Sequence, residues 1–219
     1  MKNIKRIFCL GMSAPEVVCE IVKANPEIKA LLFKKYIPIE NLEEESVIRI
    51  QNQEEEVIRI QASLKRMILH NPPESEEEIW LSRKDITPEH LNQISEPWNQ
   101  QFALAVISKI GPSGSREVRH IPMMDFSCEA SSENLEKIQG FLKRIGQKGV
   151  VLFSGRSYHF YGINLFSNKN WSNFLGQCLL FTGYTDSRHI GHRLIDGYGS
   201  LRISKEVRRP TLPTVVAIT

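Results

Sequence analysis

Residues 149–161 read Gly149-Val-Val-Leu-Phe-Ser-Gly-Arg-Ser-Tyr-His-Phe-Tyr161, and the prediction of the fold starts from them. Two runs rich in β-branched and aromatic residues, 149–153 and 158–161, flank Ser154-Gly-Arg-Ser157, whose residue types favour a turn. The pattern predicts a β-hairpin. We therefore expect a mostly antiparallel sheet around it.

Helices are predicted on both sides of this hairpin. Residues 135–145 before it and 168–181 after it carry apolar side chains at helical spacing. Farther upstream, residues 117–127 are predicted to form a strand, in which Pro122 indicates a sheet edge. This irregular alternation of helices and strands favours an α+β domain over a doubly wound sheet.

Two further strands are expected near the C-terminus, at residues 200–203 and 215–218. Before the first of them, Asp196-Gly-Tyr-Gly199 has the residues of a hairpin turn that would follow residues 192–195. Together these elements predict an α/β domain over residues 111–219.

Residues 1–110 are predicted to form a mainly helical region. Pro15 opens a first helix, and Asn25-Pro26 opens a second that reaches Phe33. A duplicated Glu-rich segment, residues 43–68, reads as one long amphipathic helix. Its apolar residues recur every seven positions, which offers a surface for a partner protein or for self-association.

The rest of this region is less regular. Residues 71–78 read as a polar linker, and Thr87-Pro88 begins another helix. Residues 102–110 form a buried run that fits a helix or a strand.

Charge and cysteine usage narrow the class of protein. The 219 residues carry a formal charge of only +3, but residues 40–78 hold eleven acidic and four basic side chains, whereas residues 149–219 hold eight basic and three acidic ones. A basic C-terminal part would attract phosphate groups. The four scattered cysteines and the absence of a long apolar run predict a reduced, cytoplasmic protein with no membrane partner.

Three blocks carry the chemistry, in the order Asp125-Phe-Ser127, Ser157-Tyr-His159 and Arg193-Leu-Ile followed by Gly199-Ser-Leu-Arg202. In this order they resemble the motifs of the archaeo-eukaryotic primase, or primase-polymerase, superfamily. The resemblance covers about the last hundred residues. It implies a nucleotidyltransferase that joins nucleotides on a single-stranded nucleic-acid template, in DNA replication or repair.

The first motif of that superfamily is a strand with two acids on one face, which hold two divalent cations for phosphoryl transfer. Asp125 matches the first acid, but Ser127 replaces the second and is a poorer ligand for Mg²⁺ or Mn²⁺. Glu129 could substitute only if the strand continues that far. The resemblance also implies a late acid, for which Asp186 and Asp196 are both candidates, and we take Asp186 as the working choice.

The second and third motifs imply contacts to a nucleoside triphosphate. Ser157 and His159 match the second motif, and the turn before them adds Ser154 and Arg156, whose guanidinium suits bidentate phosphate binding. Arg193 and Arg202 of the third motif would neutralise phosphate charge, although Arg202 stands where the family has His.

Two alternatives stay open beside the active enzyme. The altered first motif is compatible with a catalytically degenerate module that binds nucleotide, nucleic acid and partner proteins. A helical interaction protein with an ordinary α+β domain would bind neither metal nor nucleotide. The phosphate-binding loop of Walker type, the zinc pattern and the esterase elbow are absent from the sequence.

Overall fold

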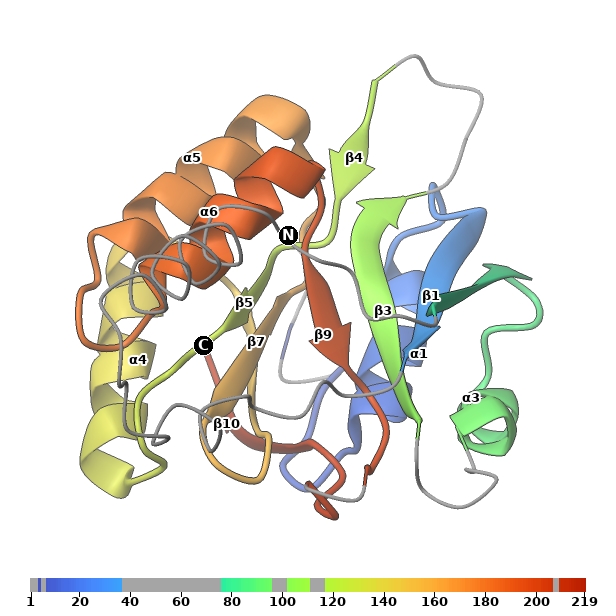
Figure 1. The fold of residues 1–219 in the computed structure, drawn as a ribbon, viewed down its shortest axis with the longest axis horizontal. Coiled ribbons are helices and arrows are strands. Elements are labelled where there is room, and N and C mark those ends of the chain that lie inside the picture. The colour runs from blue at the N-terminus through green and yellow to red at the C-terminus, as the bar shows by residue number, and fades with distance from the viewer. Residues whose placement is uncertain (1–3, 5–6, 37–75, 96–101, 111–116, 207–208) are drawn as a thin grey trace, which may run out of the picture.

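A computed structural model describes residues 4, 7–36, 76–95, 102–110, 117–206 and 209–219. These residues form a mixed α+β fold with five helices and two antiparallel sheets (Figure 1). The predicted long helix at residues 43–68 lies outside the described residues. Among the described helices, none is long and apolar enough to cross a membrane. All four cysteines carry free thiols, as predicted.

The smaller sheet has the strand order β10-β6-β7-β5 and contains the predicted hairpin. Its strands are β5 (Met123–Asp125), β6 (Gly149–Phe153), β7 (Tyr158–Gly162) and β10 (Thr214–Ile218). β5 occupies an edge, as Pro122 predicts. The hairpin prediction is confirmed: β6 and β7 pair in register from Gly149–Gly162 to Phe153–Tyr158.

The larger sheet joins strands from distant parts of the chain. Its path is β2-β1-β3-β4-β8, and β9 also pairs with β3. The strands are β1 (Ala30–Tyr36), β2 (Glu76–Ser82), β3 (Ala103–Ile110), β4 (Arg119–His120), β8 (Phe166–Ser167) and β9 (Ser200–Arg202). Strands from both sides of residue 110 share this sheet, and the boundary at that residue stays a prediction.

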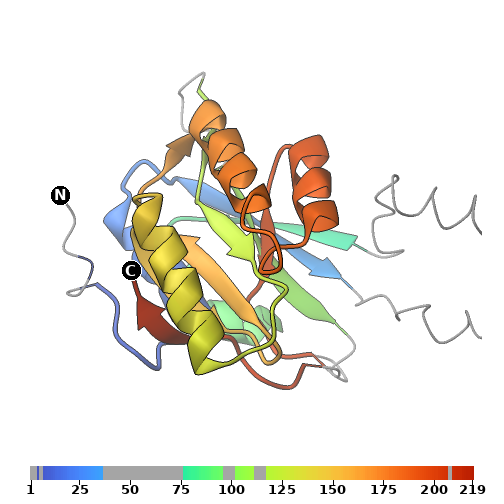
Figure 2. The ribbon, with the colours of Figure 1, turned by 90° about the vertical axis from the view of Figure 1, so that its left-hand side faces the viewer.

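Helices cover the sheets on separate sides. The helices are α1 (Ala14–Ala24), α3 (Pro88–Ser95), α4 (Ser132–Arg144), α5 (Asn168–Leu179) and α6 (Ser187–Asp196). α1 and α3 pack with the inner faces of both sheets into one core, whereas α4 and α5 cover the other face of the small sheet and form a second core (Figure 2). The helices predicted to begin at Pro15 and at Thr87-Pro88 are confirmed. The helices predicted over residues 135–145 and 168–181 are confirmed as well.

Four predictions were wrong. The helix expected to run to Phe33 is strand β1, because it pairs with β2 on one side and β3 on the other while Leu31 and Phe33 alternate into the core. Likewise, the end of the predicted linker, residues 76–78, pairs with β1 as part of β2. Pairing with neighbouring strands overrides local helix propensity here.

The single strand predicted over residues 117–127 is two short strands in different sheets. Pro122 separates them because it lacks an N–H for a ladder, so β4 pairs with β3 and β5 pairs with β7. The hairpin turn predicted at Asp196 is instead the end of helix α6, where Gly197 takes a left-handed conformation with φ of 72°.

Candidate nucleotide and metal site

The candidate site begins at the end of edge strand β5. Met123 enters the core shared with α1, and Met124 enters the core under α4 and α5. Asp125 follows at the strand end, where its side chain stays 36% exposed. Ser127 and Glu129 are exposed beyond the strand, because the chain bends after Phe126. The alternation of an edge strand thus delivers one acid to the surface.

The β6–β7 turn lies next to this acid. The N–H of Ser154 donates to the Ser157 carbonyl at 3.0 Å, and Gly155 adopts a φ of 105°, which only glycine takes without strain. Arg156 at the tip is exposed. The Ser157 Oγ atom is buried beside the Cys128 thiol and has no hydrogen-bond partner of ordinary geometry in the described chain.

The start of α6 completes the site from a third direction. Asp186 is the N-cap of this helix, and its Oδ1 accepts a hydrogen bond from the Arg188 N–H at 2.8 Å. His189 follows on the first turn. Asp196 lies at the other end of the helix, where its carboxylate pairs with Arg193 at 3.0 Å. Of the two candidate late acids, Asp186 is therefore the one beside β5.

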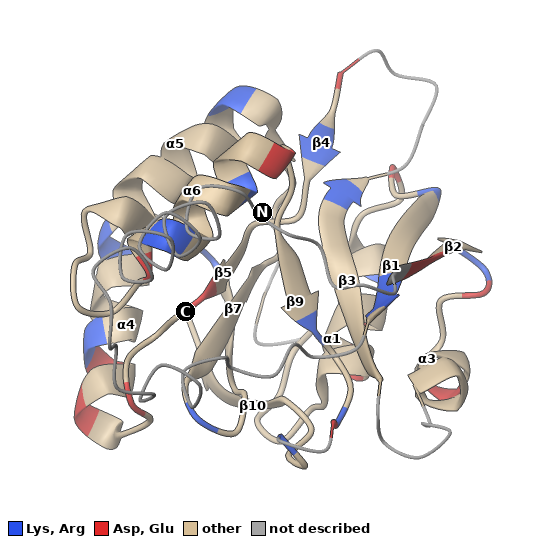
Figure 3. Cartoon of the chain, viewed as in Figure 1, with Lys and Arg blue, Asp and Glu red and all other residues tan. Residues whose placement is uncertain are grey.

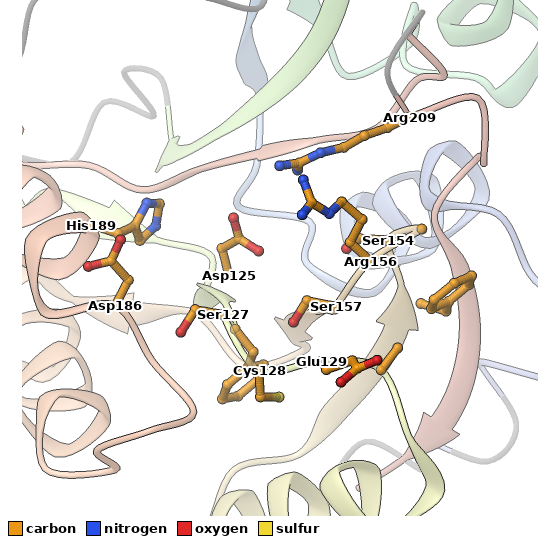
Figure 4. A pocket seen from close by; sticks show the side chains of 14 residues that line it. Asp125, Ser127, Cys128, Glu129, Ser154, Arg156, Ser157, Asp186, His189 and Arg209 are labelled. Carbon is orange, nitrogen blue, oxygen red and sulfur yellow. The ribbon is translucent and has the colours of Figure 1, made fainter. Parts of the chain in front are cut away.

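These three elements enclose a pocket of about 790 Å³. In Figure 4, Asp186 and His189 lie on one side of the pocket, Arg156 and Arg209 lie on the other, and Asp125 lies between them. Figure 3 shows the acidic end of β5 between basic positions of α6 and β9. The lining residues are Asp125, Phe126, Ser127, Cys128, Glu129, Ala130, Phe153, Ser154, Gly155, Arg156, Ser157, Asp186, His189 and Arg209.

The charge of Asp125 is set by competing neighbours. Burial raises the pKa of this carboxyl to about 6, and the charge of Asp186 raises it too, whereas Arg209 and Arg202 lower it. Because a third of the side chain reaches solvent, water moderates the effect of burial. A carboxyl with a displaced pKa in a pocket is a frequent mark of a functional site.

His159 lies beneath Asp125 rather than in the pocket. The two residues are direct cross-strand partners, and the His159 Nε2 atom is 3.5 Å from Asp125 Oδ1. Burial lowers the pKa of His159 to about 3, with Arg202, Arg209 and His189 acting in the same direction. The ring is neutral at pH 7 and only 1% exposed, so it supports Asp125 from below.

The two arginines of the third motif are also buried. Arg193 donates to Ser200 Oγ at 2.8 Å and pairs with Asp196. Arg202, 5% exposed, donates to the backbone carbonyls of Ser154, Ser204 and Thr211, at 2.6 Å for Ser154. Neither residue lines the pocket.

The remaining predicted residues do meet. The structure brings Asp125, Asp186, Ser154, Arg156 and Ser157 to one pocket. Glu129 also lines it, but β5 ends before this residue, and Figure 4 shows its carboxylate on the opposite side of the pocket from Asp186.

Two residues that line the pocket, His189 and Arg209, were not predicted from the sequence. His189 stands three residues after Asp186, a spacing that places both near one face of a helix, and this signal could have been found once α6 was known. Arg209 lies outside all three motifs and outside every regular element, and no sequence signal singles it out.

The donor set suits a hard divalent cation. Asp125 and Asp186 offer carboxylate oxygens to the pocket, and Mg²⁺ is commonly held by one or two carboxylates together with substrate phosphates and water. Among the described residues, no group of three His, Cys, Asp or Glu side chains is gathered closely enough to hold an ion alone. The residues present therefore fit an ion that arrives with a phosphorylated ligand.

Fold and pocket together define a mixed α+β domain with acids and arginines facing across a polar pocket. A family model described as AEP-like, archaeo-eukaryotic primase 1D-like, matches residues 82–214. The chain belongs to this primase-like family. No curated protein and no solved structure matches the chain significantly. The family match begins in β2 and so takes in α3 and β3 as well as the motif-bearing half.

Proposed function

We propose that this protein is a nucleotidyltransferase of primase-polymerase type, which joins nucleotides on a single-stranded template. The observation that carries the proposal is the composition of the pocket, which is lined by the carboxylates of Asp125 and Asp186 and by Arg156 with the Ser154–Ser157 turn. A nucleoside triphosphate bound with a divalent cation needs both acidic and basic groups. Family membership supports the same reading, because primase-like proteins typically use divalent metals.

Each residue has a distinct part in this proposal. Asp125 and Asp186 would hold Mg²⁺ or Mn²⁺, which when bound neutralises charge on the transferred phosphate. The exposed Arg156 guanidinium would orient the triphosphate so that the hydroxyl at the end of the growing nucleic-acid strand can attack the α-phosphate and pyrophosphate can leave. His159, buried and neutral, would keep the Asp125 carboxylate in place.

The alternative is a degenerate module that binds nucleotide or nucleic acid without turnover. Ser127 favours it, because a hydroxyl stands where the family has a second acid, and Glu129 turns to the other side of the pocket. The partner surface predicted on residues 43–68 belongs to this alternative and lies outside the described chain.

Primer synthesis and extension on single-stranded DNA separate the two functions. The assay supplies labelled NTPs or dNTPs with Mg²⁺ or Mn²⁺ and compares the wild type with Asp125→Asn, Asp186→Asn and the surface control Glu136→Gln. We expect metal-dependent product from the wild type and the control. Both aspartate variants should lose at least about 100-fold, the scale on which removal of one electrostatic group slows catalysis.

Binding of a triphosphate by a wild type that forms no product would establish the degenerate module instead. Equal product from the wild type and Asp125→Asn would refute the metal-site assignment.

A further inference from the structure

Arg209, like His189, is a lining residue that neither the sequence motifs nor the family resemblance points to. It follows β9 on an irregular segment, and its side chain is 41% exposed at the pocket. Glu206 and Arg209 exchange backbone hydrogen bonds of 3.1 and 3.0 Å, which hold the backbone of Arg209 to that of Glu206. The guanidinium therefore starts from a defined backbone position.

Glu206 contacts the Nε atom of Arg209, and the Arg209 side chain lines the pocket. Its Nε atom lies 3.9 Å from a carboxylate oxygen of Glu206, a residue that is only 5% exposed. Arg202 ties the same segment to the β6–β7 turn, since one side chain donates to the carbonyls of Ser204, Thr211 and Ser154. The turn that carries Arg156 and the segment that carries Arg209 are thus anchored to each other.

The two exposed arginines face the same space. Figure 4 shows the Arg156 and Arg209 side chains entering the pocket from the same side, with their guanidinium groups near each other above Asp125. Within the described chain, no ion pair joins Arg156 to an acidic side chain. Two like charges that face each other repel, and an anion between them would replace this repulsion with charge-assisted hydrogen bonds from both sides.

The arginine pair lines the same pocket as the acids. Arg156 and Arg209 both lie on it together with Asp125, the proposed metal ligand. A polyphosphate that binds a cation at Asp125 would carry its remaining negative oxygens toward Arg209 and Arg156. A nucleoside monophosphate has too few charges to satisfy the cation and both arginines.

We propose that Arg156 and Arg209 form a two-arginine clamp for the polyphosphate of a nucleoside triphosphate. The clamp rests on the proposed function, because it assigns a further residue of the same pocket. In this proposal Arg209 binds the ligand. Arg202 positions the β6–β7 turn and the segment that carries Arg209.

Equilibrium binding tests the clamp without requiring turnover. The ligands are a non-hydrolysable nucleoside triphosphate and the matching nucleoside monophosphate, each with Mg²⁺. The proteins are the wild type, Arg209→Gln, Arg156→Gln, and Arg144→Gln as an exposed control on α4. We expect Arg209→Gln and Arg156→Gln each to weaken triphosphate binding roughly 10- to 100-fold, as loss of a charged hydrogen-bond donor does.

The monophosphate supplies the selective readout. Its affinity should change much less than that of the triphosphate in Arg209→Gln, and Arg144→Gln should match the wild type with both ligands. Wild-type triphosphate affinity in Arg209→Gln, beside a loss in Arg156→Gln, would overturn the clamp and leave the proposed function standing. An equal loss for both ligands would also overturn it, as would an altered thermal unfolding midpoint that accounts for the loss. A wild type that binds no triphosphate would overturn the clamp and the proposed function together.

Discussion

Replacement of Arg202 by glutamine should destabilise the whole domain, even though the family resemblance places this residue on phosphate. Arg202 is 5% exposed and makes hydrogen bonds to three backbone carbonyls. Its side chain extends from the end of β9 in the larger sheet to Ser154, the residue that follows β6 in the smaller sheet. The substitution therefore removes a link between the two sheets.

The magnitude follows from those three acceptors. A hydrogen bond from a charged donor contributes about 1.5–3 kcal/mol, and a buried acceptor left without a partner costs about 1–3 kcal/mol. Glutamine is shorter and carries its two N–H donors on one nitrogen atom, so it cannot satisfy all three carbonyls. Since contributions at one side chain are not additive, we expect a loss of about 3 kcal/mol, a large share of the 5–15 kcal/mol typical of a domain.

Urea unfolding followed by circular dichroism measures this loss. The matched control is Arg144→Gln on the exposed surface of α4, which should change the free energy of unfolding by less than about 0.5 kcal/mol. An unchanged dependence of that free energy on urea concentration in both variants would show that the comparison is one of stability alone.

The opposite result has a definite meaning. If Arg202→Gln unfolds at the wild-type urea concentration but binds triphosphate weakly, Arg202 reaches the ligand and its contacts with the carbonyls contribute little. The reasoning from burial would then be refuted, and the third motif would act as the family resemblance implies.

Two further predictions concern parts of the fold away from the pocket. Gly149→Ala should cost about 2–3 kcal/mol, because a Cβ atom there would overlap the Tyr161 carbonyl oxygen, whereas the exposed helical control Gly140→Ala has open space and should gain up to about 1 kcal/mol in the same urea assay. For His120, burial lowers the pKa to about 4 from the usual 6.5, so the unfolded chain binds the proton more readily and stability falls as the pH drops from 6.5 to 4. Compared with His120→Gln, the wild type should lose roughly 1–3 kcal/mol more over that range in pH-dependent unfolding, and parallel curves for the two proteins would contradict the assignment.

Local sequence predicted the elements whose turn residues and apolar spacing agree with the contacts that they make in the folded chain. The β6–β7 hairpin was predictable from its turn residues, and α4 from the period of Leu135, Ile138 and Leu142. The sequence predicts a helix at β1 because, over this short run, its apolar residues fit the helical period as well as the strand period. Only pairing with β2 and β3, which are remote in the sequence, distinguishes a strand from a helix here.

The site divides in the same way. The motifs predicted Asp125, Ser154, Arg156 and Ser157, since each sits at a strand end or in a turn that the local sequence specifies. The sequence did not predict that Arg202 and His159 lie outside the pocket. Their positions depend on how the two sheets and β5 pack together.

The hairpin, most of the helices and the primase-like motifs follow from local sequence, because turn chemistry and apolar periodicity act over a few residues. Which charges meet depends on how the whole chain folds. Asp186 and Arg209 reach the pocket from α6 and from the segment after β9, while Arg193 and Arg202 are drawn inward to partners that only the folded chain supplies. A side chain's role depends on its burial and its partners, and these are set by contacts between residues far apart in the sequence.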